Sequence, residues 1–247
     1  GSTKRSFALG LKCRPFRNVA RCRPSVTQHP LNLLMVSSEA VPYAKTGGLA
    51  DVAGALPLAL AKLGHDVILL LPRYRCVSES SRSFRSVCRL HVPTPQGRID
   101  TLIEEDVIAV GEGDCRVRVW TIRNEGFFDR PGLYQDHGID YPDNLDRFTF
   151  FCRATIEVMA YLQTACRWKT DILHLHDWQT ALCAVYLKTV DRNRPEVQGM
   201  RTVLTLHNVG YQGLFPGKQF EKTGLPLSLF TPVGLEYYGS VNLLKGG

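Results

Sequence analysis

Lys45, Thr46, Gly47 and Gly48 form a short motif that could bind an anionic group. Glycines allow the backbone to approach a ligand closely, and a helix that begins there offers free N–H groups and the positive end of its dipole. The lysine adds a mobile cation, so the combination suits a phosphate. The spacing matches neither a P-loop nor a GxGxxG motif. A tight strand-to-helix turn without a ligand is the alternative interpretation.

A second polar motif contains His174, His176 and Asp177. Alternation along a strand places the two histidines on the same face. A metal site would need a third ligand, and none is evident nearby. We therefore expect burial with satisfied hydrogen bonds for at least one histidine. Asp177 either caps the helix that follows or lines a binding cleft.

The third motif is the pair His207-Asn208, followed by Tyr211-Gln212-Gly213. The pair comes directly after the apolar run VLTL. Polar side chains at such a position could read the hydroxyl groups of a sugar.

These motifs follow segments that are predicted to be strands. Residues 31–37 form an apolar run typical of a buried strand, and residues 49–63 read as a helix in which Pro57 introduces a kink or bend. Gly64 is placed to end this helix, and residues 66–71 form a second buried strand. This order indicates a βαβ crossover and a parallel sheet.

The remaining chain continues this pattern after a different middle part. The expected elements are strands at 84–92, 99–110 and 115–122 with hairpin-like connections, a loop at 124–143, a helix at 144–166 capped by Asp143 or Asn144, a strand at 172–176, a helix at 178–188 and a strand at 202–206. The predicted fold class is α/β, a Rossmann-like, doubly wound, mostly parallel sheet. In such a sheet ligands bind beyond the carboxyl ends of the strands, where all three motifs lie.

Composition excludes several classes of protein. The 247 residues are 44% hydrophobic and 21% charged, which is ordinary for one large globular domain or two small ones. No apolar run reaches the roughly 20 residues of a membrane span, so we expect no membrane partner. The eight cysteines form no CxxC pair. Reduced, mostly structural thiols are therefore expected rather than a zinc site or a disulfide framework.

The net charge of +7 belongs to one segment. Residues 1–30 contain seven Lys and Arg and no acidic residue, so the rest of the chain is neutral and lacks the basic excess of a nucleic-acid-binding protein. Gly1-Ser2 resembles a cloning scar. We expect residues 1–30 to be a disordered extension, either an organellar transit peptide or an extension of a bacterial protein. The first implies the plastid stroma and the second the cytoplasm.

Taken together, the motifs resemble one enzyme family. SSEAVPYAKTGGLADVAGALPLALAKLGHDVILLLPRY, FFDRPGLY, YPDNLDRF, HLHDW, LHNVGYQGLF and GLEYYGSVNLLKGG occur in the order found in bacterial-type glycogen synthases and plant starch synthases. The resemblance covers residues 31–247. It implies a GT-B fold of two Rossmann-like domains, of which this chain contains the N-terminal one, and a retaining transfer of glucose from ADP-glucose to an α-1,4-glucan. It implies neither a cofactor nor a metal.

The resemblance also implies roles for particular residues. Lys45 binds the donor, the backbone of Gly47 and Gly48 lies against its phosphates or glucose, and Asp51 orders this loop. His207 holds the donor glucose beside the reacting centre. The residues expected to line the same cleft are Asp177, which we place with His207 at the catalytic centre, Asn208 and Tyr134.

The sequence leaves two other functions open. One is a GT-B transferase that uses another nucleotide sugar such as UDP-glucose, because donor specificity depends largely on the C-terminal domain. The other is a glucan-binding module without activity, and we expect residues 1–247 alone to be inactive because half of the cleft would be absent.

Overall fold

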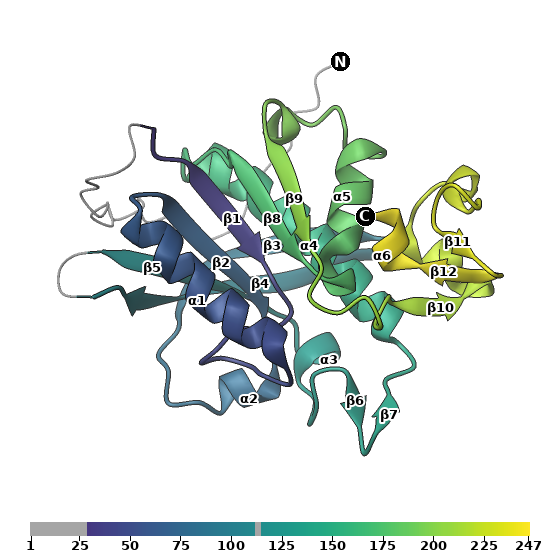
Figure 1. The fold of residues 1–247 in the computed structure, drawn as a ribbon, viewed down its shortest axis with the longest axis horizontal. Helices are drawn as coiled ribbons and strands as arrows, with labels where there is room; N and C mark the ends of the chain where they lie inside the picture. The colour runs from purple at the N-terminus through teal and green to yellow at the C-terminus, as the bar shows by residue number, and fades with distance from the viewer. Residues whose placement is uncertain (1–28, 112–114) are drawn as a thin grey trace.

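A seven-stranded sheet forms the centre of the computed structural model, which describes residues 29–111 and 115–247 (Figure 1). The strand order across the sheet is β3-β4-β5-β2-β1-β8-β9. Its strands are β1 (Asn32–Val36), β2 (Asp66–Pro72), β3 (Arg85–Thr94), β4 (Gly97–Ala109), β5 (Arg116–Arg123), β8 (Ile172–His176) and β9 (Arg201–Thr205).

The sheet is mostly parallel. β5, β2, β1, β8 and β9 run parallel to one another, whereas β4 pairs in an antiparallel way with both β3 and β5. This confirms the predicted α/β class, including the hairpin-like connections of the middle strands. Each predicted strand is present, and its ends differ from the predicted ones by at most two residues.

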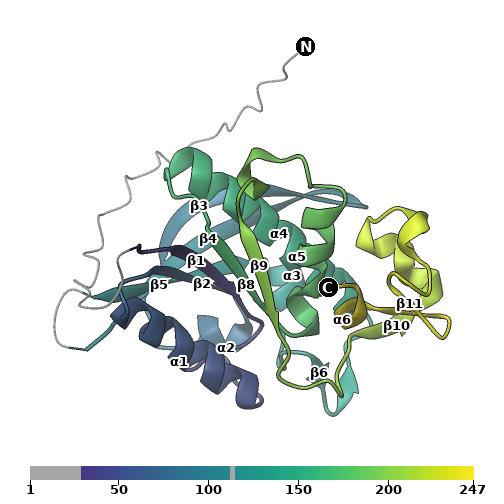
Figure 2. The ribbon, with the colours of Figure 1, turned by 45° about the horizontal axis from the view of Figure 1, so that its top comes forward.

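Helices cover both faces of this sheet. The main helices are α1 (Gly48–Lys62), α4 (Asn144–Ala165) and α5 (Trp178–Lys188). The chain moves from β1 to β2 in one direction and from β8 to β9 in the other, and right-handed crossovers then place α1 and α5 on opposite faces. Figures 1 and 2 show α1 on one side of the sheet and the α4–α5 pair on the other. The doubly wound arrangement is therefore confirmed.

Helix α1 continues through Pro57, which is buried inside it. Its C-cap is Leu63, and Gly64 follows with φ of +97°, a left-handed conformation that glycine adopts without steric cost. The prediction that Gly64 ends the helix is confirmed.

Helix α4 is a core helix, with 16 of its 22 residues buried. Asp143 occupies its N-cap position, as predicted, but the side chain of Asp143 makes no capping hydrogen bond. Its carboxylate instead accepts from Arg130 Nη1 at 2.7 Å and from Nη2 at 2.5 Å. The residue is at the predicted place, but an ion pair uses the oxygens that a cap would need.

Smaller elements fill the connections. The segment predicted as a loop at 124–143 contains one helical turn and a hairpin whose two strands have two residues each. The C-terminal part of the chain forms a further sheet with the strand order β10-β12-β11. These elements are α2 (Arg75–Ser78), α3 (Glu125–Phe128), β6 (Gln135–Asp136), β7 (Ile139–Asp140), η1 (Pro195–Val197), β10 (Leu214–Pro216), η2 (Gly217–Thr223), η3 (Leu227–Leu229), β11 (Glu236–Tyr237), β12 (Ser240–Asn242) and α6 (Leu243–Gly246).

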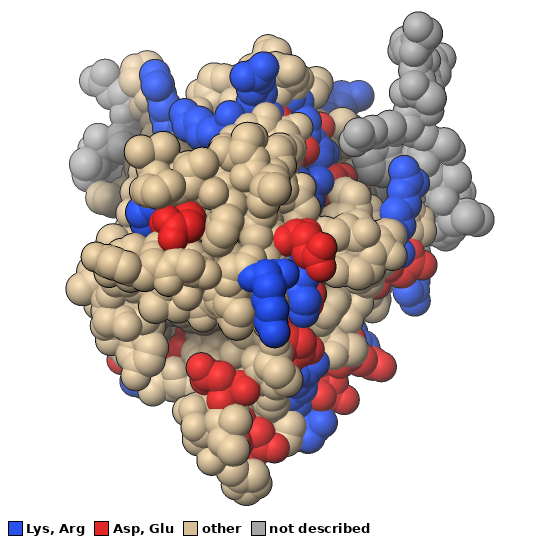
Figure 3. Space-filling view, turned by 90° about the vertical axis from the view of Figure 1, so that its right-hand side faces the viewer, with Lys and Arg blue, Asp and Glu red and all other residues tan. Residues whose placement is uncertain are grey.

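The distribution of charge along the chain can be compared with the surface of the described residues. Residues 1–28 of the basic extension lie outside the described residues. Basic and acidic side chains are interspersed over the face seen in Figure 3.

The described cysteines are mostly thiols. Cys76, Cys152 and Cys183 are thiols, as expected, but Cys115 is bonded in a disulfide, which corrects the expectation at that position. Among the described residues, no helix has the length and apolar composition that a bilayer span requires.

Candidate active site

The three polar motifs meet at one edge of the sheet. Val36 of β1 pairs with Leu175 of β8, and His176 of β8 pairs with Thr205 of β9. The loops that begin after these strands therefore start side by side. The chain reverses its winding direction between β1 and β8, and ligands of doubly wound sheets bind at such a switch point.

The first loop presents an ion pair beside an open helix N-terminus. Lys45 Nζ donates to both carboxylate oxygens of Asp51, at 2.7 and 2.8 Å, and both side chains are about half exposed, at 52% and 57%. Gly47 is the N-cap of α1 and has no side chain to cap it. No atom lies within 4 Å of a Cβ built on Gly47 or Gly48, so the backbone here is open to a ligand.

Glu39 holds this loop in place, and the sequence analysis did not assign it a role. Glu39 is 3% exposed, and its carboxylate accepts hydrogen bonds from Thr46 N (2.5 Å), Thr46 Oγ1 (2.7 Å) and Gly47 N (3.3 Å). A glutamate two residues beyond Ser37, close to the end of a buried strand and before a glycine pair, is the signal that could have indicated it. The amide of Gly47 is thus used inside the protein. Gly48, the first residue of α1, is exposed, and its amide has no intrahelical partner.

Tyr134 reaches the same carboxylate from a distant part of the chain. Its hydroxyl donates to Glu39 Oε1 at 2.7 Å and lies 2.7 Å from Ser38 Oγ. Burial, followed by the nearby Tyr74 and Glu39, raises the pKa of Tyr134 well above its ordinary value. The phenol therefore stays protonated and serves as a donor that joins the loop containing Tyr134 to the loop after β1.

The second motif forms a stack of imidazole rings. His174 and His176 lie on the same face of β8, as predicted, with ring centroids 4.3 Å apart, and His207 stacks on His176 at 5.2 Å. His174 Nε2 lies 2.7 Å from Thr205 Oγ1, and His176 Nδ1 lies 2.9 Å from His207 Nε2. Burial, and then the neighbouring His174 and His207, lower the pKa of His176 to about 3. His176 is therefore neutral at ordinary pH.

Asp177 does not cap helix α5, and the capping interpretation is wrong. The residue occupies the N-cap position, but its φ is +58° and its side chain makes no capping bond. Asp177 Oδ1 accepts the backbone N–H of His207 at 2.7 Å instead. The side chain thus fixes the start of the third loop. A positive φ costs about 1 kcal/mol or more for a residue other than glycine, which marks this turn as one that the surrounding structure enforces.

The third motif divides into a cleft part and a structural part. His207 is half-buried, and Asn208 is exposed with its Oδ1 accepting Gly210 N at 2.9 Å. Gln212 Oε1 accepts Asn242 Nδ2 at 2.6 Å. Gly213 has φ of +64°, and a Cβ there would come within 2.6 Å of the Trp178 ring. Gln212 and Gly213 therefore join the loop to α5 and to the C-terminal segment.

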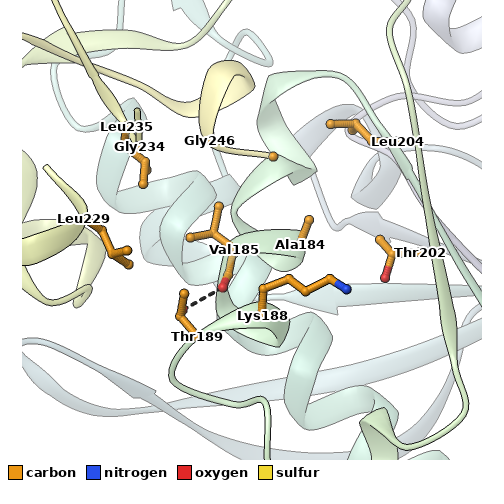
Figure 4. A pocket seen from close by; sticks show the side chains of 11 residues that line it. Ala184, Val185, Lys188, Thr189, Thr202, Leu204, Leu229, Gly234, Leu235 and Gly246 are labelled. Atoms are coloured by element: carbon orange, nitrogen blue, oxygen red, sulfur yellow. Dashed lines mark hydrogen bonds between the residues drawn. The ribbon is translucent and has the colours of Figure 1, made fainter. Parts of the chain in front are cut away.

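The structure also contains a cavity of about 310 Å³ away from these loops. It lies between α5, β9 and the C-terminal segment, with mostly apolar side chains and Lys188 at its border (Figure 4). None of the predicted site residues lines it. The candidate site is thus defined by the loops at the sheet edge.

The eight predicted residues fall into two bonded groups on neighbouring strand ends. Lys45, Asp51, Gly47 and Gly48 belong to the start of α1, which Glu39 ties to Tyr134. The other group is Asp177 with His207, next to Asn208. The Lys45 ammonium group beside the exposed start of α1, together with the His207 ring on the neighbouring loop, can bind a phosphate and an adjacent polar group.

Residues 32–247 match the family model of the starch synthase catalytic domain. The chain belongs to this family. It is 40% identical to glycogen synthase 2 of Geobacter sulfurreducens over 216 residues, which is 87% of this chain and 43% of that protein. It is also 40% identical to the glycogen synthase of Thermotoga maritima over 225 residues, or 88% of this chain and 43% of that protein.

A solved structure shows the same fold within the starch synthase family. The catalytic domain of starch synthase IV from Arabidopsis thaliana, bound to ADP and acarbose, matches with a TM-score of 0.72 and 28% identity, over 88% of this chain and 43% of that one. The chain thus spans less than half the length of these relatives and corresponds to their N-terminal half. The predicted N-terminal half of a GT-B fold is confirmed.

Proposed function

We propose that this chain is the N-terminal domain of a glycogen or starch synthase, which transfers glucose from ADP-glucose to the non-reducing end of an α-1,4-glucan with retention. One observation carries the proposal. In a chain of this family, the Lys45 loop at the start of α1 and His207 lie beyond adjacent parallel strands of the switch point. The structure of starch synthase IV contains ADP and acarbose, which fits a nucleotide-sugar donor and a glucan acceptor.

The geometry supports a division of roles. The ammonium group of Lys45 has three donors, so it can keep Asp51 as a partner and still bind a donor phosphate. The helix amides that begin at Gly48 add to this binding. We place the donor glucose against His207, whose backbone is fixed by Asp177, with Asn208 and Tyr134 in the wall of the same cleft.

The proposed reaction exchanges one glycosidic bond for another on one face of the sugar. The 4-hydroxyl of the acceptor forms a bond to the anomeric carbon as the bond to the diphosphate oxygen breaks. The electron pair leaves with ADP, and the leaving phosphate takes the proton of the attacking hydroxyl. The transition state is oxocarbenium-like. Catalysis then depends on positioning and on stabilising the leaving diphosphate, and closure of the two domains excludes water.

The deciding test is a glucan-elongation assay with labelled ADP-glucose and glycogen, performed on this chain and on the full-length product. Incorporation by the full-length protein, and none by residues 1–247, supports the proposal. Preference for UDP-glucose would indicate a transferase with another donor. Binding of maltooligosaccharide without transfer by either protein would indicate a glucan-binding module.

The proposed compartment follows from the role of residues 1–30. In a bacterial host the enzyme acts in the cytoplasm, and with a cleaved transit peptide it acts in the plastid stroma. Mass spectrometry of the native protein would distinguish the two, because only a transit peptide is removed.

A further inference from the structure

His176 is stacked against two other imidazole rings and has no access to solvent. Its side chain is 0% exposed, and the rings of His174 and His207 both stack with it. Its Nδ1 lies 2.9 Å from His207 Nε2. Two ring nitrogens at this distance share one proton, because two protonated nitrogens would repel and two bare nitrogens would form no hydrogen bond.

The proton can be placed by considering the other nitrogen of His176. Among the described residues, His176 Nε2 is buried and has no hydrogen-bond partner. If His207 donated the shared proton, neutral His176 would carry its own proton on Nε2, as a buried N–H without an acceptor. Buried N–H groups without a partner are rarer in proteins than buried acceptors without one. The arrangement in which His176 Nδ1–H donates therefore leaves the less costly defect.

A doubly protonated His207 is disfavoured for the same reason. It would have to donate from Nε2, and the proton of neutral His176 would again lie on the buried Nε2 without an acceptor. The low pKa of His176, about 3, excludes the remaining case in which His176 itself is doubly protonated. The hydrogen bond between the two rings thus has a single donor direction, from His176 to His207.

We propose that His176 is a positioning residue that fixes the tautomer of His207. By donating Nδ1–H to His207 Nε2, it leaves His207 as the Nδ1–H tautomer, so that the part of the ring turned away from His176 presents a hydrogen-bond donor. Asp177 holds the backbone of the same residue through His207 N. Position and tautomer of His207 are therefore set by two consecutive residues at the end of β8. This arrangement suits an acceptor oxygen on the ligand, such as a hydroxyl oxygen of the transferred sugar.

The identity of that ligand rests on the proposed function, but the tautomer does not. It can be measured on this chain without any ligand, by ¹⁵N NMR of ring-labelled histidines with His174→Phe, His176→Phe and His207→Asn used for assignment. The expected spectrum shows His207 protonated at Nδ1 and bare at Nε2, and His176 in the same form. A proton on Nε2 of His207 would overturn the proposal.

Matched variants test whether His176 is the cause. His176→Phe keeps a stacked ring without a donor, so we expect His207 to move toward the Nε2–H tautomer. His176→Asn places an amide where Nδ1 was and should restore Nδ1–H. His174→Phe is the control, since His174 bonds Thr205 rather than His207. An unchanged His207 tautomer in His176→Phe would overturn the proposal. If that variant does not fold, His176→Gln replaces it, because its amide lies at the Nε2 position.

A kinetic measurement on the full-length enzyme adds a second readout. There, His176→Phe should lower kcat for glucose transfer by about 10²-fold, with a smaller effect of His176→Asn, in line with the loss of one oriented donor. Equal kcat for His176→Phe and the parent would contradict the positioning role. Absence of any transfer by the parent would refute the proposed function and leave the tautomer result intact.

Discussion

The carboxylate of Asp177 accepts the backbone N–H of His207, with Oδ1 and N 2.7 Å apart, and so joins the end of β8 to the end of β9. The two residues are 30 positions apart in the sequence. Because the parallel pairing of β8 with β9 brings their ends together, a residue at a helix start can hold a loop of the next strand instead of its own helix.

Removing this acceptor should destabilise the domain. Asp177→Ala removes the acceptor and leaves the backbone N–H of His207 without this partner, which should cost about 1–3 kcal/mol of unfolding free energy. Asp177→Asn keeps an acceptor oxygen and has the same backbone strain as the parent, so its unfolding free energy should stay within about 1 kcal/mol of the parent value. Urea unfolding measures both. Equal stabilities of the two variants would show that the bond to His207 contributes nothing.

Glu39 should be needed for the conformation of the Lys45 loop, whose Thr46 and Gly47 amides donate to it. Glu39→Gln turns an amide toward groups that now donate to a carboxylate, and at least one buried donor loses its partner. We expect a loss of about 1–3 kcal/mol in unfolding free energy and a higher KM for ADP-glucose in the full-length enzyme. The control is Glu79→Gln, at an exposed position. A KM equal to that of the control would contradict the role of Glu39.

Lys45 should affect function rather than stability. Its ion pair with Asp51 is half exposed, so Lys45→Ala should change the unfolding free energy by less than about 1 kcal/mol. In the full-length enzyme we expect kcat/KM for ADP-glucose to fall by about 10²–10³-fold. Lys62→Ala, at the other end of the same helix, is the matched control. A Lys45→Ala enzyme with the parent's kcat/KM would remove Lys45 from the donor site.

His207 should contribute to the chemical step. His207→Ala removes the ring that His176 and Asp177 position, and we expect kcat in the full-length enzyme to fall by about 10²–10³-fold. The exposed His137 provides the control variant His137→Ala. Equal kcat/KM for His207→Ala and the control would place His207 outside the active site.

Stability should fall in mild acid because of His176. The pKa of its side chain is 6.5 in an unfolded chain and about 3 in the folded one, so between these values the unfolded state binds a proton that the folded state does not. The free energy of unfolding then decreases as pH falls from 6.5 toward 3, by up to about 1.4 kcal/mol per pH unit from this residue. Urea unfolding at several pH values should show a shallower slope for His176→Phe. Equal slopes of unfolding free energy against pH for His176→Phe and the parent would contradict a low pKa of His176.

Most of the fold could be predicted from the sequence. Apolar runs of strand length, an Ala- and Leu-rich helix between two of them, and Gly64 after that helix are local signals, and the structure confirms them. The motifs could also be placed beyond the strands, because the carboxyl ends of parallel strands share one edge. Residue types and spacing were therefore enough to predict the fold class and to place the three motifs at one edge of the sheet.

The partners of the polar side chains were decided only by the tertiary structure. Asp143 and Asp177 both stand where a helix cap is expected, yet one binds Arg130 and the other binds His207 N. Glu39 meets Tyr134 across 95 positions of sequence. A carboxylate takes whichever donor the packing brings within reach, and this depends on strand order and register. Local residue patterns encode the elements, whereas these contacts exist only once the elements have been assembled.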